Sequence, residues 1–267
     1  MFLLELLGIY VLAYCIGSIP FSQIITTLVK PGTNLREVGS ANSGATNVFI
    51  TVGPVPGIIA LLLDMSKGLV ALFIVKSIMQ WSFNADLWWL LSVTLFVVLG
   101  HDYSPFLGFK GGKGFAILES YLIFFGPVWV IMVHLPQAIV LFQKNMQRGI
   151  AVANIMVLLM FPIMGCLWFV ENHMEANWLT WDFTHILGEP IQQTLPLTVF
   201  SFIWMVIYFV QRVLDNPGVK DDINKGISAW RAIMLRGVFE VFPLESDYRH
   251  PGEIMPMGED VLVPKKG

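Results

Sequence analysis

A glycine-rich loop near the middle of the chain has the residue types that bind anions. Three glycines surround two lysines directly before an apolar segment, in the order Lys110, Gly111, Gly112, Lys113, Gly114. Backbone N–H groups, the positive end of a helix dipole and mobile ammonium groups together favour an anion with more than one charge. We therefore predict that this loop is an anion-binding site. If the lysines only mark the cytoplasmic side of a membrane, the glycines have no explanation.

The loop does not fit the nucleotide-binding P-loop. That motif needs a glycine where Leu107 stands, and it needs Ser or Thr directly after the lysine, where this chain has Gly114. We therefore do not predict that this loop binds a nucleotide.

Another polar loop, which we call the first loop because it comes earlier in the chain, precedes an apolar segment and offers hydroxyl and amide groups. Its candidate ligands are Ser40, Asn42, Thr46 and Asn47. The neighbouring glycines let backbone N–H groups turn inward, so the loop can form a concavity for a phosphate or carboxylate. A turn with helix-capping serine and asparagine explains the same residues at least as well.

Two pairs of titratable residues accompany these loops. Asp64 and Lys67 stand three positions apart inside an apolar segment, where both are costly unless they face each other or a polar site. A structural ion pair and a pair that supports the site are equally consistent with this spacing.

His101 precedes Asp102, which invites a general-base role for His101. Adjacent side chains at a helix end diverge, however, so Asp102 is poorly placed to orient the imidazole, and a histidine bonded to backbone is the simpler alternative.

The composition is that of a membrane protein. The 267 residues are 55% hydrophobic and 13% charged, with a mean hydropathy of +0.68, which is too apolar for a water-soluble domain of this length. The net charge of −3 leaves no basic excess for binding nucleic acid. The sequence also lacks Cys/His metal spacing, paired catalytic carboxylates and a Gly-x-Ser-x-Gly turn.

Seven apolar segments can cross or enter a bilayer, for which a full crossing needs about 17 to 25 residues. We therefore predict an all-α polytopic membrane protein with seven transmembrane helices, some of them short. The segments are Phe2–Val29, Pro54–Met79, Leu87–Gly100, Phe115–Phe125, Val128–Phe142, Ile150–Val170 and Leu195–Phe209. Gly126 and Pro127 divide the fourth from the fifth, because proline breaks a helix. A single helix through Pro127 would leave six.

The lysines and arginines favour the seven-helix arrangement, because short cytoplasmic loops carry most of them. With the N-terminus outside, the basic residues at 30, 36, 110, 113, 144 and 148, and the eight from Arg212 onward, all fall on the cytoplasmic side. The 171–194 loop has no lysine or arginine and is predicted to be external. Residues 1–214 then form the membrane domain, and residues 215–267 form a cytoplasmic tail.

The tail contains one amphipathic pattern. Ile223, Ile227, Trp230 and Met234 recur at helical spacing, opposite basic residues. Such a helix either lies on the anionic inner leaflet or packs on the helix bundle, and the pattern favours neither alternative over the other.

Four blocks, which include both loops, resemble the bacterial acyl-phosphate:glycerol-3-phosphate acyltransferases of the PlsY type. They keep that family's order and spacing over residues 1 to about 155. The blocks are Gly17–Phe21; Arg36–Ser40 with Asn42 and Gly44–Val48; Leu62–Asp64 with Lys67 and Gly68; and Gly100, His101, Pro105–Leu107 and Phe109–Gly114.

The resemblance implies a membrane enzyme that moves a long acyl chain from acyl phosphate to the 1-hydroxyl of glycerol 3-phosphate. The products would be lysophosphatidate and inorganic phosphate, in the first acylation of phospholipid synthesis. Similar proteins have seven transmembrane helices and an external N-terminus. The resemblance also implies the bacterial cytoplasmic membrane, an active site that faces the cytoplasm, and no metal or coenzyme.

The resemblance gives each candidate site residue an expected role. The donor is a reactive mixed anhydride, so its phosphate must be held and its charge stabilised more than a strong protein nucleophile is needed. The predicted catalytic residues are Lys113, His101 and Ser40. The donor phosphate is assigned to the loop from Lys110 to Gly114. The predicted acceptor contacts are Ser40, Asn42, Thr46 and Asn47, with Asp64 and Lys67 as supporting residues.

The sequence departs from the family's pattern mainly on the acceptor side. Four positions differ from the family's usual residue: Ile50 replaces arginine, Ala41 replaces glycine, Ile117 replaces threonine, and Ala151 or Asn154 replaces serine. In addition, the family's late His-Arg-x-Asn signature is reduced here to Gln211–Leu214. Only the change at Ile50 removes a full charge from the first loop. Two interpretations follow: a catalyst of the same or a related reaction, and a non-catalytic paralogue that binds lipid or anion or supports another membrane enzyme. We favour the catalyst, because the donor loop is complete.

Overall fold

The structure is a computed structural model. It describes residues 2–39, 42–83, 85–125, 195–214, 217–224 and 226–234, together with the single positions 159, 163 and 166. These residues form helices and the turns and loops between them, which confirms the all-α prediction for this part of the chain.

The first apolar segment folds as two helices rather than one. Helix α1 spans Phe2–Ser18 and α2 spans Phe21–Val29. The break falls at Ile19 and Pro20, because the residue before a proline is pushed out of the helical conformation and Pro20 has no N–H to donate. The prediction of one segment over 2–29 was therefore right in extent but missed the break.

Helix α4 spans Pro54–Met79, as the sequence predicts. Proline suits the first helical position, and the helix ends where Gln80 adopts a left-handed conformation with φ 54°. One face of α4 is buried along its length, through Gly57, Ala60, Asp64, Lys67, Gly68, Ala71, Leu72 and Val75. The opposite face exposes residues such as Leu62 and Val70, as a lipid-facing surface requires.

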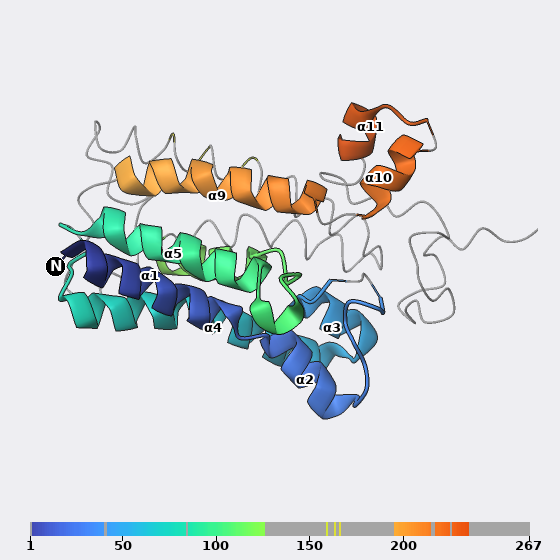
Figure 1. Cartoon of the computed structure of the whole chain (residues 1–267), viewed down its shortest axis with the longest axis horizontal. Coiled ribbons are helices and arrows are strands. Elements are labelled where there is room, and N and C mark those ends of the chain that lie inside the picture. Colours follow the sequence, from blue (N-terminus) through green and yellow to red (C-terminus); the bar gives the residue numbers. More distant parts are fainter. Residues whose placement is uncertain are drawn as a thin grey trace, which may run out of the picture.

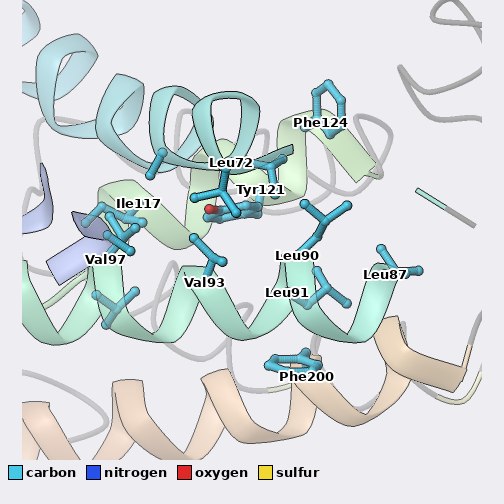
Figure 2. Close-up of a cluster of buried hydrophobic side chains, with 14 of the residues drawn as sticks. Leu72, Leu87, Leu90, Leu91, Val93, Val97, Ile117, Tyr121, Phe124 and Phe200 are labelled. Carbon is cyan, nitrogen blue, oxygen red and sulfur yellow. The ribbon is translucent and has the colours of Figure 1, made fainter. Parts of the chain in front are cut away.

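The core lies between α1, α4, α5, α6 and α9. Helix α5 spans Leu87–Asp102, α6 spans Phe115–Phe125 and α9 spans Leu195–Leu214. Figure 2 shows Tyr121 of α6 between Leu72 of α4 and the valine and leucine side chains of α5, with Phe200 of α9 on the other side of α5. The Tyr121 hydroxyl donates to the Gly68 carbonyl at 3.0 Å, which satisfies the polar end of this buried ring.

The polar loops gather at one end of the helices. Helices α1, α4 and α5 run lengthwise beside one another, with the N-terminus at one end (Figure 1). At the opposite end lie α2, the short helix α3 at Ala45–Thr51, and the connection from α5 to α6, which contains a single 3-10 turn at Pro105–Leu107. The elements that carry candidate chemistry thus converge from three separate parts of the chain.

Three helical stretches are long and apolar enough to cross a bilayer among the residues described. They are Phe2–Val29, Pro54–Met79 and Leu87–Leu107. The membrane class is therefore confirmed, and the external N-terminus and the count of seven helices stay predictions. The predicted segments over 128–142 and 150–170 and the 171–194 loop lie outside the described residues, apart from the single positions given above.

The amphipathic pattern in the tail does not form one helix. Helix α10 spans Pro217–Asn224 and α11 spans Ala229–Ile233, and Gly226 between them has φ +87°. A positive φ ends a right-handed helix, so the predicted stripe is divided between two short helices. Trp230 on α11 is 70% exposed.

Candidate active site

The glycine-rich loop is held against the end of α5 by its own backbone. The Gly111 N–H donates to the Asp102 carbonyl at 2.7 Å, and the Gly112 N–H donates to the His101 carbonyl at 3.1 Å. Both amides point toward α5, so our expectation that they are open to an anion is corrected for these two residues. The anion-binding groups that remain are the half-buried Lys113 side chain and the first turn of α6.

Glycine is required in this loop because the chain approaches α5 so closely. A methyl group at Gly111 would overlap the His101 carbonyl, and one at Gly112 would overlap Nε2 of the His101 ring. Gly114 has φ +66°, a conformation that side chains rarely adopt, and its Cα faces the Asp102 carboxylate. The loop conformation is therefore tied to the last two residues of α5.

Asp64 and Lys67 form a buried ion pair on the inner face of α4. The Lys67 Nζ lies 2.8 Å from Asp64 Oδ1, and the two residues are 2% and 1% exposed. The Ser22 hydroxyl of α2 donates to Asp64 Oδ2 at 2.7 Å. The two charges face each other, which is one of the arrangements that their spacing allows, and their cost in an apolar setting is offset by direct contact and hydrogen bonds.

The same lysine contacts His101, a link that the sequence did not predict. The Lys67 Nζ is 3.1 Å from His101 Nδ1, and His101 Nδ1 is 3.9 Å from Asp64 Oδ1. The carboxylate that follows His101 in the sequence, Asp102, lies instead toward Gly114. His101 is thus oriented by the α4 pair and not by its neighbour, as the divergence argument for adjacent side chains anticipated.

In the first loop, the Asn47 side chain holds the loop backbone together. Its side-chain amide donates to the carbonyls of Leu35, Val38 and Asn42 at 2.8, 3.0 and 2.8 Å, and the residue is 1% exposed. The predicted direct contact between this amide and an acceptor therefore has no support from the geometry. Gly39, with φ +55°, packs against the Asn47 side chain.

The other predicted acceptor residues are placed differently. The Asn42 Oδ1 accepts the Gly44 N–H at 2.8 Å, which caps the turn before α3. Thr46 is exposed in the first turn of α3. Ser40, a predicted catalytic and acceptor residue, lies outside the described residues.

The two loops meet directly. The Arg36 guanidinium donates through Nη1 to the Gly111 carbonyl at 3.3 Å, and the Ser43 hydroxyl donates to the Lys110 carbonyl at 3.4 Å. Arg36 was noted in the sequence only as part of a motif and as a cytoplasmic charge. No spacing rule could pair it with a loop 75 positions away.

Three of the departures from the family pattern fall on residues that the structure describes. Ile50 is half-buried on α3, close in sequence to the first loop, while Ile117 is fully buried in α6. Gln211–Leu214 forms the last turn of α9. Positions 41, 151 and 154 lie outside the described residues. Within the described ranges, no group of three or more His, Cys, Asp or Glu side chains could hold a metal ion.

Comparisons with known proteins bear on the whole membrane domain. A family model described as glycerol-3-phosphate acyltransferase matches residues 7–215. The glycerol-3-phosphate acyltransferase of Desulforamulus reducens is 33% identical over 188 residues, which cover 68% of this chain and 90% of that protein. The protein of the same name from Thermotoga petrophila is 47% identical over 106 residues, covering 40% of this chain and 51% of that protein.

Two solved structures share the fold. A crystal structure of PlsY, an integral membrane glycerol 3-phosphate acyltransferase in its glycerol 3-phosphate form, is 25% identical with a TM-score of 0.55, over 84% of this chain and 94% of that chain. The lysophosphatidic acid form is 22% identical with a TM-score of 0.54, and that likeness concerns the fold alone.

Proposed function

The chain belongs to the glycerol-3-phosphate acyltransferase family, so it is a membrane enzyme that acylates glycerol 3-phosphate in phospholipid synthesis, and we propose that its acyl donor is an acyl phosphate. The observation that carries the proposal is the direct contact between the two loops, through Arg36 to Gly111 and Ser43 to Lys110. A cationic loop beside a polar loop can hold two phosphate-bearing substrates next to each other.

The reaction needs positioning more than a protein nucleophile. The acceptor hydroxyl oxygen attacks the acyl carbonyl carbon, the bond from that carbon to the phosphate oxygen breaks, and the hydroxyl proton ends on the released phosphate. The products are lysophosphatidate and inorganic phosphate. Lys113 and the first turn of α6 hold the donor phosphate and stabilise the charge that develops as it leaves.

Arg36 is the basic side chain that the first loop offers at this junction. An arginine is typical directly after the Thr-Asn-Val-x run, which is Thr46–Phe49 here, and this chain has Ile50 at that position. The Arg36 guanidinium already lies against the glycine loop, and a guanidinium recognises phosphate in bidentate geometry. We assign the acceptor phosphate to the region around Arg36, Asn42 and Thr46.

The loops face the cytoplasm in this proposal, and the protein lies in the bacterial cytoplasmic membrane. Lys30 follows the last residue of α2, Arg36 lies between α2 and α3, and Lys110 and Lys113 lie between α5 and α6. These elements gather at one end of the molecule (Figure 1), and basic residues favour the cytoplasmic side. Both substrates reach the site from that side, with the acyl chain between helices.

Purified full-length protein in lipid vesicles tests the proposal. With palmitoyl phosphate and glycerol 3-phosphate, we expect lysophosphatidate and inorganic phosphate to appear in equal amounts. Palmitoyl-coenzyme A in place of palmitoyl phosphate should give no product. Transfer from the thioester, or no transfer from palmitoyl phosphate, would show that the donor is wrongly assigned.

A further inference from the structure

The Lys67 ammonium group has three close acceptors. Its Nζ lies 2.8 Å from Asp64 Oδ1, 3.2 Å from the Gly17 carbonyl oxygen and 3.1 Å from His101 Nδ1. An ammonium group has three N–H donors and no acceptor, so in its contact with His101 Lys67 can only be the donor. The three partners come from α4, α1 and α5, which places Lys67 where these helices meet.

This geometry fixes the proton on His101. Lys67 forms an ion pair with Asp64 and donates one N–H to the Gly17 carbonyl oxygen. It donates another to Nδ1 of His101, which must then present its lone pair to Lys67, because an ammonium group cannot accept. In the neutral imidazole the proton therefore sits on Nε2.

Nε2 lies against the glycine loop. A methyl group at Gly112 would overlap this nitrogen, and the Gly112 N–H donates to the carbonyl of the same histidine. The backbone at position 112 thus rests on both the ring and the main chain of His101. Lys113 follows directly, so the position of its backbone depends on where the His101 ring lies.

We propose that Asp64, Lys67 and His101 form a positioning unit that sets the glycine loop, with His101 held as the Nε2–H tautomer rather than acting as a general base. A general base needs a free lone pair directed at the acceptor hydroxyl. In His101 the Nδ1 lone pair is engaged by Lys67, and Nε2 carries a proton. This inference rests on the proposed function, because the loop that is set is the one that holds the donor phosphate.

The tautomer can be measured without any activity assay. Nitrogen-15 NMR of histidine-labelled protein distinguishes Nε2–H from Nδ1–H, and the spectrum of a His101→Asn variant identifies the His101 signals among the five histidines. We expect the Nε2–H form in the wild type. Lys67→Met, which removes the donor to Nδ1 but keeps a long apolar stem, should produce a mixture of tautomers. A dominant Nδ1–H form in the wild type would overturn the proposal.

A double-mutant cycle tests whether the loop rests on the ring. Asn at position 101 keeps an acceptor for Lys67 but has no ring atom where Nε2 lies, so it leaves room for a methyl group at position 112. We expect Gly112→Ala to cost about tenfold more in phosphate release in the wild-type background than in the His101→Asn background, because contacting residues couple. Equal costs in both backgrounds would contradict contact between ring and loop.

The His101→Asn variant also separates positioning from base catalysis. It should keep at least about a tenth of wild-type turnover, whereas removal of a general base costs on the order of 100-fold or more. A loss of that size with the donor Michaelis constant unchanged would overturn the proposal. His101→Leu offers Lys67 no acceptor, so it should raise the Michaelis constant for palmitoyl phosphate.

The outcomes distinguish the two proposals. If the wild type makes no lysophosphatidate from palmitoyl phosphate, the donor assignment fails while the tautomer measurement still decides the role of Lys67. If the wild type is active but His101 carries its proton on Nδ1 or the cycle shows no coupling, only the positioning unit is wrong.

Discussion

The two lysines of the glycine loop differ in burial, and this separates a functional role from simple anchoring. Lys113 is half-buried next to Gly114, whereas Lys110 is exposed. Lys113→Ala should reduce phosphate release about 100-fold, by analogy with the loss of a donor that stabilises developing charge. Lys110→Ala is the matched control and should cost much less. Equal and small effects in correctly inserted protein would reduce the loop to a connector.

At the residue scale, short spacings were predictable and long ones were not. Asp64 and Lys67 could be paired from the sequence because residues three apart share a helix face. The contact of Lys67 with His101 spans 34 positions and two helices, and no periodicity encodes it. The backbone contacts of Asn47 were missed for another reason. Sequence cannot tell whether a polar side chain in a loop turns toward a ligand or toward its own backbone, and the amide of Asn47 turns toward the backbone.

At the element scale, glycines let α1 and α5 pack backbone to backbone. A methyl group at Gly100 would overlap the Tyr14 carbonyl and lie 2.9 Å from the Ser18 nitrogen, and one at Gly17 would overlap the Val97 carbonyl. Small residues at such contacts let membrane helices approach closely. Gly100→Ala should therefore destabilise the protein by about 1 to 3 kcal/mol through overpacking.

The measurement is the thermal unfolding midpoint in detergent, with Gly8→Ala on α1 as the control. A Cβ at Gly8 would meet no other atom within 4 Å, so this change should leave the midpoint unchanged or raise it. If Gly100→Ala unfolds at the wild-type temperature, α1 and α5 are not held as closely as described.

Element boundaries were predictable where proline and composition agree. Helix α4 runs from Pro54 to Met79 as expected, because proline opens it and polar residues follow it. The first segment was predicted as continuous from its apolar run and the tail helix from its helical spacing, and each is broken, at Pro20 and at Gly226. Both breaks have a local physical cause, and in both the apolar pattern was given more weight than the residue that interrupts it.

At the scale of the whole molecule, the two ends carry different charge. The end with the loops has Lys30, Lys110 and Lys113, while at the other end Lys76 lies over the Phe83 ring, 5.0 Å from its centroid. The buried Asp64–Lys67 pair contacts α1, α2 and α5. The basic side chains are thus concentrated at the end where a phosphate-bearing substrate would enter. Apolar side chains are exposed on α1 and α4, as a lipid-facing surface requires.

The last prediction is the direction of the chain across the membrane. In a background with Cys15 and Cys166 changed to alanine, single cysteines are placed at the exposed positions Ala85 and Ser228 and at Asn177 in the 171–194 loop. A maleimide that cannot cross the membrane should label Ala85→Cys and Asn177→Cys on intact bacterial cells, and Ser228→Cys only after permeabilisation, because the basic loops and tail stay on the cytoplasmic side.

Labelling in the reverse pattern would place both loops outside, away from substrates made in the cytoplasm, and would contradict the orientation proposed for the active site. Labelling of Ala85→Cys but not of Asn177→Cys would contradict the seven-helix arrangement alone. That arrangement has four crossings between the two positions, α5 and the three predicted segments after it, and an even number leaves both positions on the same side. The three positions therefore test the orientation and the helix count separately.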